Sequence, residues 1–319
     1  MSGPLVLAPV FKERLWGGQR LSEWYGDLVP DGTIGEAWAI SGMPGDAGLV
    51  VDGPGAGGTL DEAWRSGLVT GTPRDDDFPL LVKLLDPADW LSVQVHPDDD
   101  QARLLEDQPR GKAECWLIVE AAPGAEIILG HRDETAAALR RAFDDRVLET
   151  RLLRQPVGPG SFFMIPAGCV HAIGPGMLIY EVQQASDITY RMYDFDRRDK
   201  DGRPRDLHVD KAFSVITAPY DVARSLTALP ARPAAGGTVR PLVDNDHFTV
   251  RELRIDGRAA VGSAEQFELL TVVGGSGILT VDGVDRELPR GTSLVLPAGV
   301  LGSIAGTLTV VATRPGPSA

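Results

Sequence analysis

One short pattern occurs twice in the sequence and limits the folds that the chain can adopt. The copies run from Gly160 to His171 and from Gly291 to Gly302, and each has a glycine, five residues and then Pro-x-Gly. Each copy predicts a glycine turn, an apolar strand and a second turn, so one structural unit is used twice. Only the first copy ends on a histidine, so only that copy can deliver a metal ligand from its second turn.

Short β-rich runs fill much of the remaining sequence. The 319 residues include 37 glycines and 24 prolines, which separate these runs. Short strands between turn residues are typical of β-sandwiches and barrels, so we expect an all-β fold. The predicted strands are 90–95, 115–119, 126–129, 161–165, 177–183, 248–255, 267–273, 277–281, 293–296 and 307–313.

Three stretches predict helices instead. These are 98–106, 135–154 with Asp133 as its N-cap, and 210–215. The Ala/Pro/Gly-rich stretch 226–237 is typical of a linker or a loose loop. We therefore place a domain boundary near residue 235. The predicted domains are 1–235, with a helical insert at about 132–155, and 236–319.

The composition excludes several classes of function. The chain is 43% hydrophobic and 24% charged, which is typical of a soluble globular protein. No apolar run approaches the roughly 20 residues that a membrane span needs, and the formal charge of -14 disfavours nucleic acid as a partner. The two cysteines, Cys115 and Cys169, lie in apolar runs and no secretory signal is visible, so we expect a cytoplasmic protein with buried thiols.

Two predicted strands carry a polar face. In 91–97 the alternation of side chains places Ser92, Gln94 and His96 together, and in 111–116 it places Lys112 with Glu114. The turn of the first repeat adds His171. Two imidazoles and a carboxylate, with an amide nearby, suit zinc or another divalent first-row metal ion.

A third segment, 180–198, adds a carboxylate and a guanidinium. Glu181 lies on a predicted strand, and Arg191 lies between two tyrosines in a setting suited to gripping an anion. Arg191 could equally pair with a neighbouring aspartate on a surface turn. The basic residues that follow alternate with aspartates, which favours a largely solvated loop. These residues are Arg197, Arg198, Lys200, Arg203 and Arg205.

The chain resembles the class I mannose-6-phosphate isomerases, in their compact bacterial form. The blocks that carry this resemblance are 11–18, 34–41, 81–86, 91–98, 111–116, 165–172 and 181–194. The resemblance implies two cupin-type (jelly-roll) β-barrels, of which the second lacks metal ligands. It also implies a metal-dependent aldose–ketose isomerase that interconverts mannose 6-phosphate and fructose 6-phosphate through an enediolate.

The same resemblance implies roles for individual residues. The implied ligands of one divalent ion, usually zinc, are Gln94, His96, Glu114 and His171. The implied catalytic residues are Arg191, Lys112 and Glu181, and the implied substrate-binding residues are Ser92, Trp16 and Glu36. One departure is Ile173, where larger members of the family carry a tyrosine, and this removes one hydroxyl contact to the substrate.

Several questions stay open from the sequence. We favour Glu181 as the base, with Lys112 as its rival, and either Lys112 or Arg191 could hold the phosphate. A cupin oxygenase with a two-histidine, one-carboxylate iron site is an alternative function. A non-catalytic cupin that binds sugar phosphates is another. The sequence does not decide between a monomer and a homodimer.

Overall fold

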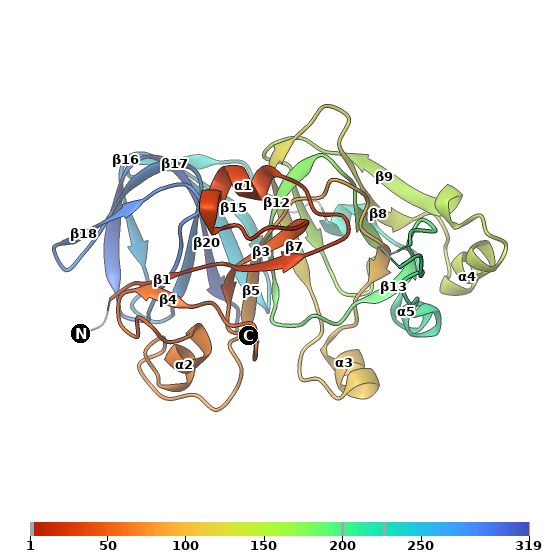
Figure 1. The fold of residues 1–319 in the computed structure, drawn as a ribbon, viewed down its shortest axis with the longest axis horizontal. Helices are drawn as coiled ribbons and strands as arrows, with labels where there is room; N and C mark the ends of the chain where they lie inside the picture. Colours follow the sequence, from red (N-terminus) through yellow and green to blue (C-terminus); the bar gives the residue numbers. More distant parts are fainter. Residues whose placement is uncertain (1–2, 199–200, 226–227, 319) are drawn as a thin grey trace.

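Two β-rich lobes lie side by side in the computed structural model, which describes residues 3–198, 201–225 and 228–318. The C-terminal strands, in blue, form the lobe on the left of Figure 1, and the yellow and green strands form the lobe on the right. An all-β chain with few helices was expected, and the structure confirms it. No helix among the described residues has the length and apolar character that crossing a membrane requires.

The first lobe contains two antiparallel sheets that face each other. One sheet has the order β10-β7-β12-β5-β3-β2, and its strands are β2 (Val10–Glu13), β3 (Ile34–Ser41), β5 (Leu80–Leu85), β7 (Glu114–Ala121), β10 (Phe162–Ile165) and β12 (Met177–Gln184). The other has the order β13-β6-β11-β8-β9, with β6 (Val93–Val95), β8 (Glu126–His131), β9 (Leu152–Pro156), β11 (His171–Ile173) and β13 (Tyr190–Tyr193). Apolar side chains from both sheets, including Trp116, Ile127 and Phe163, form the core between them.

The second lobe is one curved sheet of nine strands with its own apolar core. Its order is β14-β15-β16-β20-β17-β19-β1-β4, and β18 pairs with β17. The strands are β1 (Leu5–Leu7), β4 (Val50–Asp52), β14 (Arg232–Ala234), β15 (Gly237–Asp244), β16 (Phe248–Gly262), β17 (Glu268–Val281), β18 (Val284–Leu288), β19 (Ser293–Leu296) and β20 (Leu301–Pro315). The strands predicted at 267–273 and 277–281 are thus a single strand, β17, with an irregularity in its pairing.

The N-terminal segment links the two lobes. Strand β1 pairs with β19 of the second lobe, with Leu5 opposite Val295, while β2 pairs with β3 of the first lobe. The outer face of the six-stranded sheet packs against the second lobe, in a cluster that includes Val82, Tyr180 and Phe248. The lobes therefore share a hydrophobic core, and the boundary near residue 235 stays a prediction.

Both copies of the repeated pattern adopt the predicted turns. Gly168 and Gly299 have φ values of +80° and +83°, a region that side chains other than glycine rarely enter. The preceding glycines, Gly160 and Gly291, also have positive φ. In each copy the strand precedes Pro-x-Gly, and a new strand, β11 or β20, follows it.

The helices agree only in part with the sequence. The predictions 98–106 and 210–215 correspond to α3 (Asp99–Glu106) and α5 (Val209–Val215). The α-helices α1 (Arg20–Tyr25) and α2 (Leu60–Arg65) were not predicted. The remaining helical elements are α4 (Ala136–Asp144) and the short 3-10 helices η1 (Gly26–Leu28), η2 (Leu148–Arg151) and η3 (Val222–Ser225).

The long helix predicted at 135–154 is wrong in its extent and its cap. It ends at Asp144, and the left-handed backbone of Arg146 turns the chain toward strand β9, which pairs with β8. The N-cap is Thr135, whose hydroxyl accepts from the Ala138 amide at 3.1 Å. Asp133 instead receives two hydrogen bonds from Arg151.

The stretch predicted as a linker also contains structure. Residues 226–227 lie outside the described residues, but Arg232–Ala234 forms the edge strand β14, which pairs with β15. All three of its residues are exposed. The Ala/Pro/Gly composition thus corresponds to an edge strand and a tight turn rather than to a linker alone.

Candidate active site

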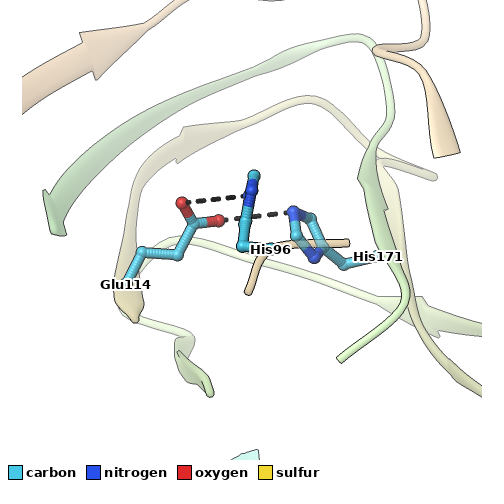
Figure 2. A group of neighbouring side chains, drawn as sticks. All are labelled: His96, Glu114 and His171. Carbon is cyan, nitrogen blue, oxygen red and sulfur yellow. Dashed lines mark ion pairs between the residues drawn. The ribbon is translucent and has the colours of Figure 1, made fainter. Parts of the chain in front are cut away.

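Three fully buried polar side chains meet inside the first lobe. His96 follows β6, and Glu114 and His171 begin β7 and β11. The Nε2 atoms of His96 and His171 lie 3.7 and 3.4 Å from the two carboxylate oxygens of Glu114 (Figure 2). The three side chains are at most 1% exposed, and their ligand atoms all lie within 4.8 Å of one another.

Backbone hydrogen bonds hold the three segments together. The Gly168 amide donates to the His96 carbonyl at 2.9 Å, so the repeat turn is tied to the end of strand β6. Glu114 pairs with Ile165, the last residue before the same turn. Because one turn contacts both partners, its position fixes how His171 meets His96 and Glu114.

The hydrogen bonds of His96, Glu114 and His171 leave side-chain nitrogen and oxygen atoms that can bind a cation. The Nδ1 atoms of His96 and His171 lie 2.8 and 3.0 Å from the carbonyls of Ile188 and Cys169. Donation to these carbonyls places the proton on Nδ1 and leaves a lone pair on Nε2. The Nε2 of His96 and both oxygens of Glu114 are buried without a hydrogen-bond partner. Such atoms are costly unless something binds them, and a divalent metal ion fits this donor set.

Burial also keeps the imidazoles neutral. It lowers the pKa of His96 well below its ordinary value, with the charge of Lys112 adding to the effect. Burial similarly lowers the pKa of His171 to about 4. Both rings are therefore unprotonated near neutral pH, which is the form that binds a metal ion.

Gln94 lies beside this group. Its Nε2 is 3.2 Å from the Nε2 of His171, and its Oε1 accepts from the Ser92 hydroxyl at 3.3 Å. The side chains of Ser92 and Gln94 share one strand face, as the alternation predicted. A metal ion binds an amide through oxygen, so coordination by Gln94 requires its oxygen to face the histidine.

A cavity of about 460 Å³ opens next to the three buried side chains. Eight of the ten residues that the sequence predicted for the site line it, and the other two are His96 and His171 themselves. The eight are Trp16, Glu36, Ser92, Gln94, Lys112, Glu114, Glu181 and Arg191. A cavity of about 1020 Å³ lies elsewhere and contains none of the ten, so chemistry rather than size identifies the site.

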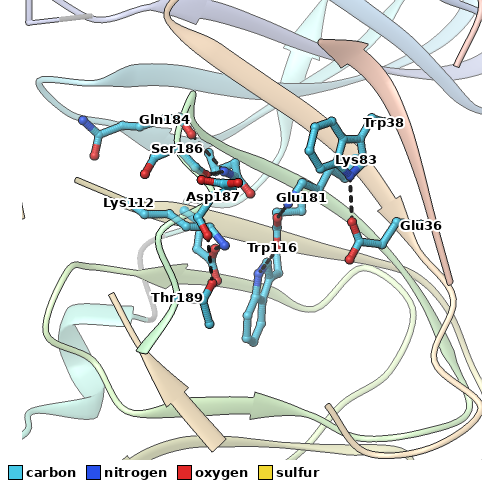
Figure 3. A network of polar contacts seen from close by, with 12 residues as sticks. Glu36, Trp38, Lys83, Lys112, Trp116, Glu181, Gln184, Ser186, Asp187 and Thr189 are labelled. Atoms are coloured by element: carbon cyan, nitrogen blue, oxygen red, sulfur yellow. Dashed lines mark hydrogen bonds and ion pairs between the residues drawn. The ribbon is translucent and has the colours of Figure 1, made fainter. Parts of the chain in front are cut away.

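Ion pairs line one side of the cavity. The Nζ of Lys112 lies 3.1 Å from Glu114, and the Nζ of Lys83 lies 3.4 Å from Glu181. The Trp116 indole donates to Glu181 at 2.9 Å (Figure 3), while the other oxygen of Glu181 has no hydrogen-bond partner. Burial, followed by the negative charge of Glu114, raises the pKa of Glu181.

Sequence reasoning assigned no role to several residues that line the cavity. Lys83 is 6% exposed and lies over the Trp38 ring, 5.2 Å from its centroid. A single lysine in the apolar run Leu80–Leu85 was a usable signal, because an unpaired lysine is costly in a buried strand. Arg205 was predicted to be part of a solvated loop, but it also lines the cavity.

The second lobe holds no comparable ligand group among the described residues. The turn that binds His96 in the first lobe binds Ser263 in the second, since the Gly299 amide donates to the Ser263 carbonyl at 2.9 Å. Glu268, opposite Leu296 just before the turn, matches Glu114. Its Oε1 accepts from Arg251 and Arg314 at 2.6 and 2.9 Å. Guanidinium groups therefore neutralise the carboxylate there.

Comparisons with known proteins agree with this arrangement. Residues 5–115 match the family model described as "Phosphomannose isomerase type I, catalytic domain", and residues 238–315 match "Mannose-6-phosphate isomerase, cupin domain". The chain is 41% identical over 299 residues to "Probable mannose-6-phosphate isomerase GmuF" of Bacillus subtilis, covering 93% of this chain and 94% of that protein. It is 38% identical to the mannose-6-phosphate isomerase of Streptococcus mutans, over 98% of this chain and 99% of that protein.

A solved structure shows the same fold. The crystal structure of a mannose 6-phosphate isomerase from Bacillus subtilis superposes with a TM-score of 0.92 at 38% sequence identity, covering 97% of this chain and 99% of that one. The similarity spans both lobes. The expected pair of cupin-type barrels is therefore confirmed.

Proposed function

The chain belongs to the type I phosphomannose isomerase family, and from this premise we propose that it interconverts mannose 6-phosphate and fructose 6-phosphate in the cavity of the first lobe. Family membership sets aside the oxygenase and the non-catalytic alternatives. The observation that carries the assignment to this cavity is the buried group His96, Glu114 and His171, in which the Nε2 of His96 and both oxygens of Glu114 have no hydrogen-bond partner.

The protein is metal-dependent, as its family is, and we propose zinc as the ion. His96, Glu114 and His171 would hold it, with Gln94 as a fourth ligand through its amide oxygen. When bound, the ion supplies Lewis-acid stabilisation of negative charge on the sugar oxygens. The partnerless atoms of His96 and Glu114 support this assignment.

Glu181 is the proposed base. Isomerisation removes the proton from C2 of mannose 6-phosphate and returns a proton to C1, while the hydroxyl proton at O2 is exchanged for one at O1. One buried oxygen of Glu181 has no hydrogen-bond partner and lies 3.4 Å from the Lys83 ammonium, and the other oxygen accepts from the Trp116 indole. A carboxylate held in this way, with a raised pKa, suits proton transfer on carbon.

The two remaining roles, stabilising charge on the reacting oxygens and binding the phosphate, are assigned to Lys112 and Arg191. Lys112 pairs with Glu114, so its ammonium lies beside the proposed metal ligands and would stabilise charge on the reacting oxygens. Arg191, on β13, pairs with Gln94 of the neighbouring strand β6, and its Nη1 donates to the Asp206 carbonyl at 2.8 Å. We assign the phosphate to Arg191. Trp16, Glu36 and Ser92 would line the sugar.

The first test is a coupled assay of mannose 6-phosphate conversion before and after treatment with a chelator. We expect activity to be lost with the metal and restored by added Zn²⁺, because the enediolate needs charge stabilisation. Metal content is measured on the same samples. Full activity in metal-free protein would contradict the metal assignment, and absence of turnover in metal-loaded protein would contradict the function.

The second test is Glu181→Gln. The amide keeps the shape of the side chain and its contact with Trp116 but cannot take a proton, so kcat should fall at least about 100-fold. Metal content should equal that of the unchanged protein, because Glu181 is not among the proposed ligands. Near-normal turnover would remove Glu181 from the role of base.

We also propose that the protein acts in the cytoplasm, as a sugar-phosphate enzyme whose two buried cysteines form no disulfide within the described chain.

A further inference from the structure

Two arginines converge on one buried aspartate beside the cavity. Asp194 is 5% exposed, and it accepts from Arg205 through Nε and Nη2 at 2.7 and 2.5 Å. It also accepts from the Nη2 of Arg197 at 2.7 Å. Arg197 has a second carboxylate, Asp89 at 3.3 Å, whereas Asp194 is the one carboxylate that pairs with Arg205 among the described residues. The single negative charge of Asp194 is therefore shared between two positively charged guanidinium groups.

Arg191 adds a third guanidinium to this region. It makes no ion pair with any carboxylate of the described residues, and its buried Nε has no hydrogen-bond partner. Burial lowers its pKa, and the positive charges of Arg205 and Arg197 add to this effect. Arg191 and Arg205 line the same cavity. Like charges held close together in this way favour the binding of an anion.

The opposite side of the cavity is balanced instead. Lys12 forms an ion pair with Asp46, and Lys83 forms one with Glu181. Arg14 donates two hydrogen bonds to Glu36, at 2.8 and 3.2 Å. Each cation there has its own carboxylate. On the arginine side, Asp187 is exposed and offsets part of the charge, but Arg191 forms no ion pair with a carboxylate of the described residues. An anionic group is therefore best accommodated beside Arg191 and Arg205.

We propose that Arg205 binds the substrate's phosphate together with Arg191, and that Asp194 is a positioning residue that holds Arg205 at the cavity. This inference rests on the proposed function. Asp194 uses the Nε and Nη2 of Arg205, and the Nη1 makes no hydrogen bond within the described chain. A guanidinium fixed on one edge can still offer this nitrogen to a phosphate oxygen.

The test compares Arg205→Ala, Arg205→Lys and Asp194→Asn with Arg198→Ala. Arg198 is exposed on the same loop and does not line the cavity, and its Nη1 donates to the Gly202 carbonyl at 2.8 Å, which makes it a matched control. For Arg205→Ala we expect KM for mannose 6-phosphate to rise about 10- to 100-fold, as the loss of a charged hydrogen bond implies. We expect kcat to change by less than about threefold, since the phosphate is remote from the reacting carbons.

Two further readouts separate positioning from general damage. Inorganic phosphate should inhibit the unchanged protein competitively, and its inhibition constant should rise in parallel with KM in Arg205→Ala. Asp194→Asn should shift both constants in the same direction but less, because Arg205 keeps its charge and loses its orientation. Arg205→Lys should lie between Arg205→Ala and the unchanged protein, since it keeps the charge without the planar fork.

The outcomes distinguish this inference from the proposed function. Calorimetric binding of inorganic phosphate to the metal-loaded protein does not depend on turnover, so it tests the arginines even if no isomerase activity is found. If Arg205→Ala binds phosphate as tightly as Arg198→Ala and has the same KM, the inference is wrong. If Asp194→Asn fails to fold, Arg205→Ala and Arg205→Lys still show whether Arg205 binds the phosphate.

Discussion

At the scale of single residues, burial decides what each charged group of the cavity can do. His96 and Glu114 are buried with atoms that have no hydrogen-bond partner, which suits them to bind a metal ion, although Lys112 also forms an ion pair with Glu114. Glu36, in contrast, accepts hydrogen bonds on both oxygens. Arg14 and the Trp38 indole donate to Glu36. A carboxylate so fully engaged is suited to shape the cavity rather than to transfer protons.

Glu36 provides a prediction about pH. Burial opposes its ionisation, but the charges of Lys83 and Arg14 lower its pKa from 4.5 to about 2. Because the folded-state pKa is the lower one, ionised Glu36 stabilises the fold above pH about 4.5, and this contribution is lost as the pH falls toward about 2. Relative to Glu36→Gln, the protein should lose about 1 kcal/mol of unfolding free energy between pH 6 and pH 4.

Urea unfolding of both proteins at each pH measures this difference. Glu36→Gln serves as the reference because it keeps the shape of the side chain without a titrating group. A difference that stays constant between pH 6 and pH 4 would show that Glu36 has an ordinary pKa, and the ion pair with Arg14 would then be weaker than its geometry implies.

At the scale of elements, the same turn has different consequences in the two lobes. Gly168 and Gly299 share a positive φ and the same place after the proline. A Cβ on Gly168 would lie 2.3 Å from the Thr217 hydroxyl and 2.9 Å from the Val215 carbonyl, whereas a Cβ on Gly299 would meet nothing within 4 Å. The turn that carries the histidine is therefore packed closely, and its counterpart is open.

This pair of glycines gives a matched prediction. Gly299→Ala should cost about 1–2 kcal/mol of unfolding free energy, from the left-handed backbone alone. Gly168→Ala should cost a further 1–3 kcal/mol or so, from the overlap with Thr217 and Val215. Because Gly168 also holds His96, only Gly168→Ala should lower the metal content. Urea unfolding and metal analysis check this, and equal losses in the two variants would contradict it.

At the scale of the whole molecule, strand pairing makes the lobes interdependent. Strand β1 is near the N-terminus but completes the sheet of the second lobe, and the six-stranded sheet packs its outer face on that lobe. Tyr180 of the first lobe reaches the Thr271 hydroxyl of the second at 3.4 Å. A shared core of this kind favours cooperative unfolding of both lobes.

The chain offers a direct measurement of this cooperativity. All six tryptophans lie before residue 117, and residues 236–319 contain none. Trp24 and Trp64 contact Arg290 and Phe267 of the second lobe, so fluorescence reports the first lobe and its junction with the second, while far-ultraviolet circular dichroism reports the strands of both lobes. We expect the two denaturation curves to coincide. Leu5→Ala, at a fully buried site on β1, should shift both curves together and cost about 2–5 kcal/mol.

Leu104→Ala is the control, because Leu104 is 83% exposed and its loss should leave both curves nearly unchanged. Separate transitions, with Leu5→Ala moving only the one seen by circular dichroism, would show that the lobes unfold independently. In that case the contacts between Tyr180 and the second lobe contribute little to stability.

The sequence by itself determined the local features of this protein. The alternation of residues 91–97 placed Ser92 and Gln94 on one face, and the repeat predicted both glycine turns, because strand and turn geometry depends on nearby residues. The motifs also identified the family. Every predicted strand overlaps an observed one, although the eight-residue strands β3 and β15 and several shorter strands were missed.

Tertiary structure decided which strands pair and which charged side chains reach the cavity, because pairing between distant segments cannot be read from the pattern of neighbouring residues. The helix predicted at 135–154 ends at Asp144, and its last predicted residues instead form β9, which pairs with β8. Strand β1 pairs with β19, where Leu5 lies opposite Val295. Arg205 enters the cavity because Asp194 holds it there. A sequence shows which charges exist, but only the fold determines which of them meet and which stay in water.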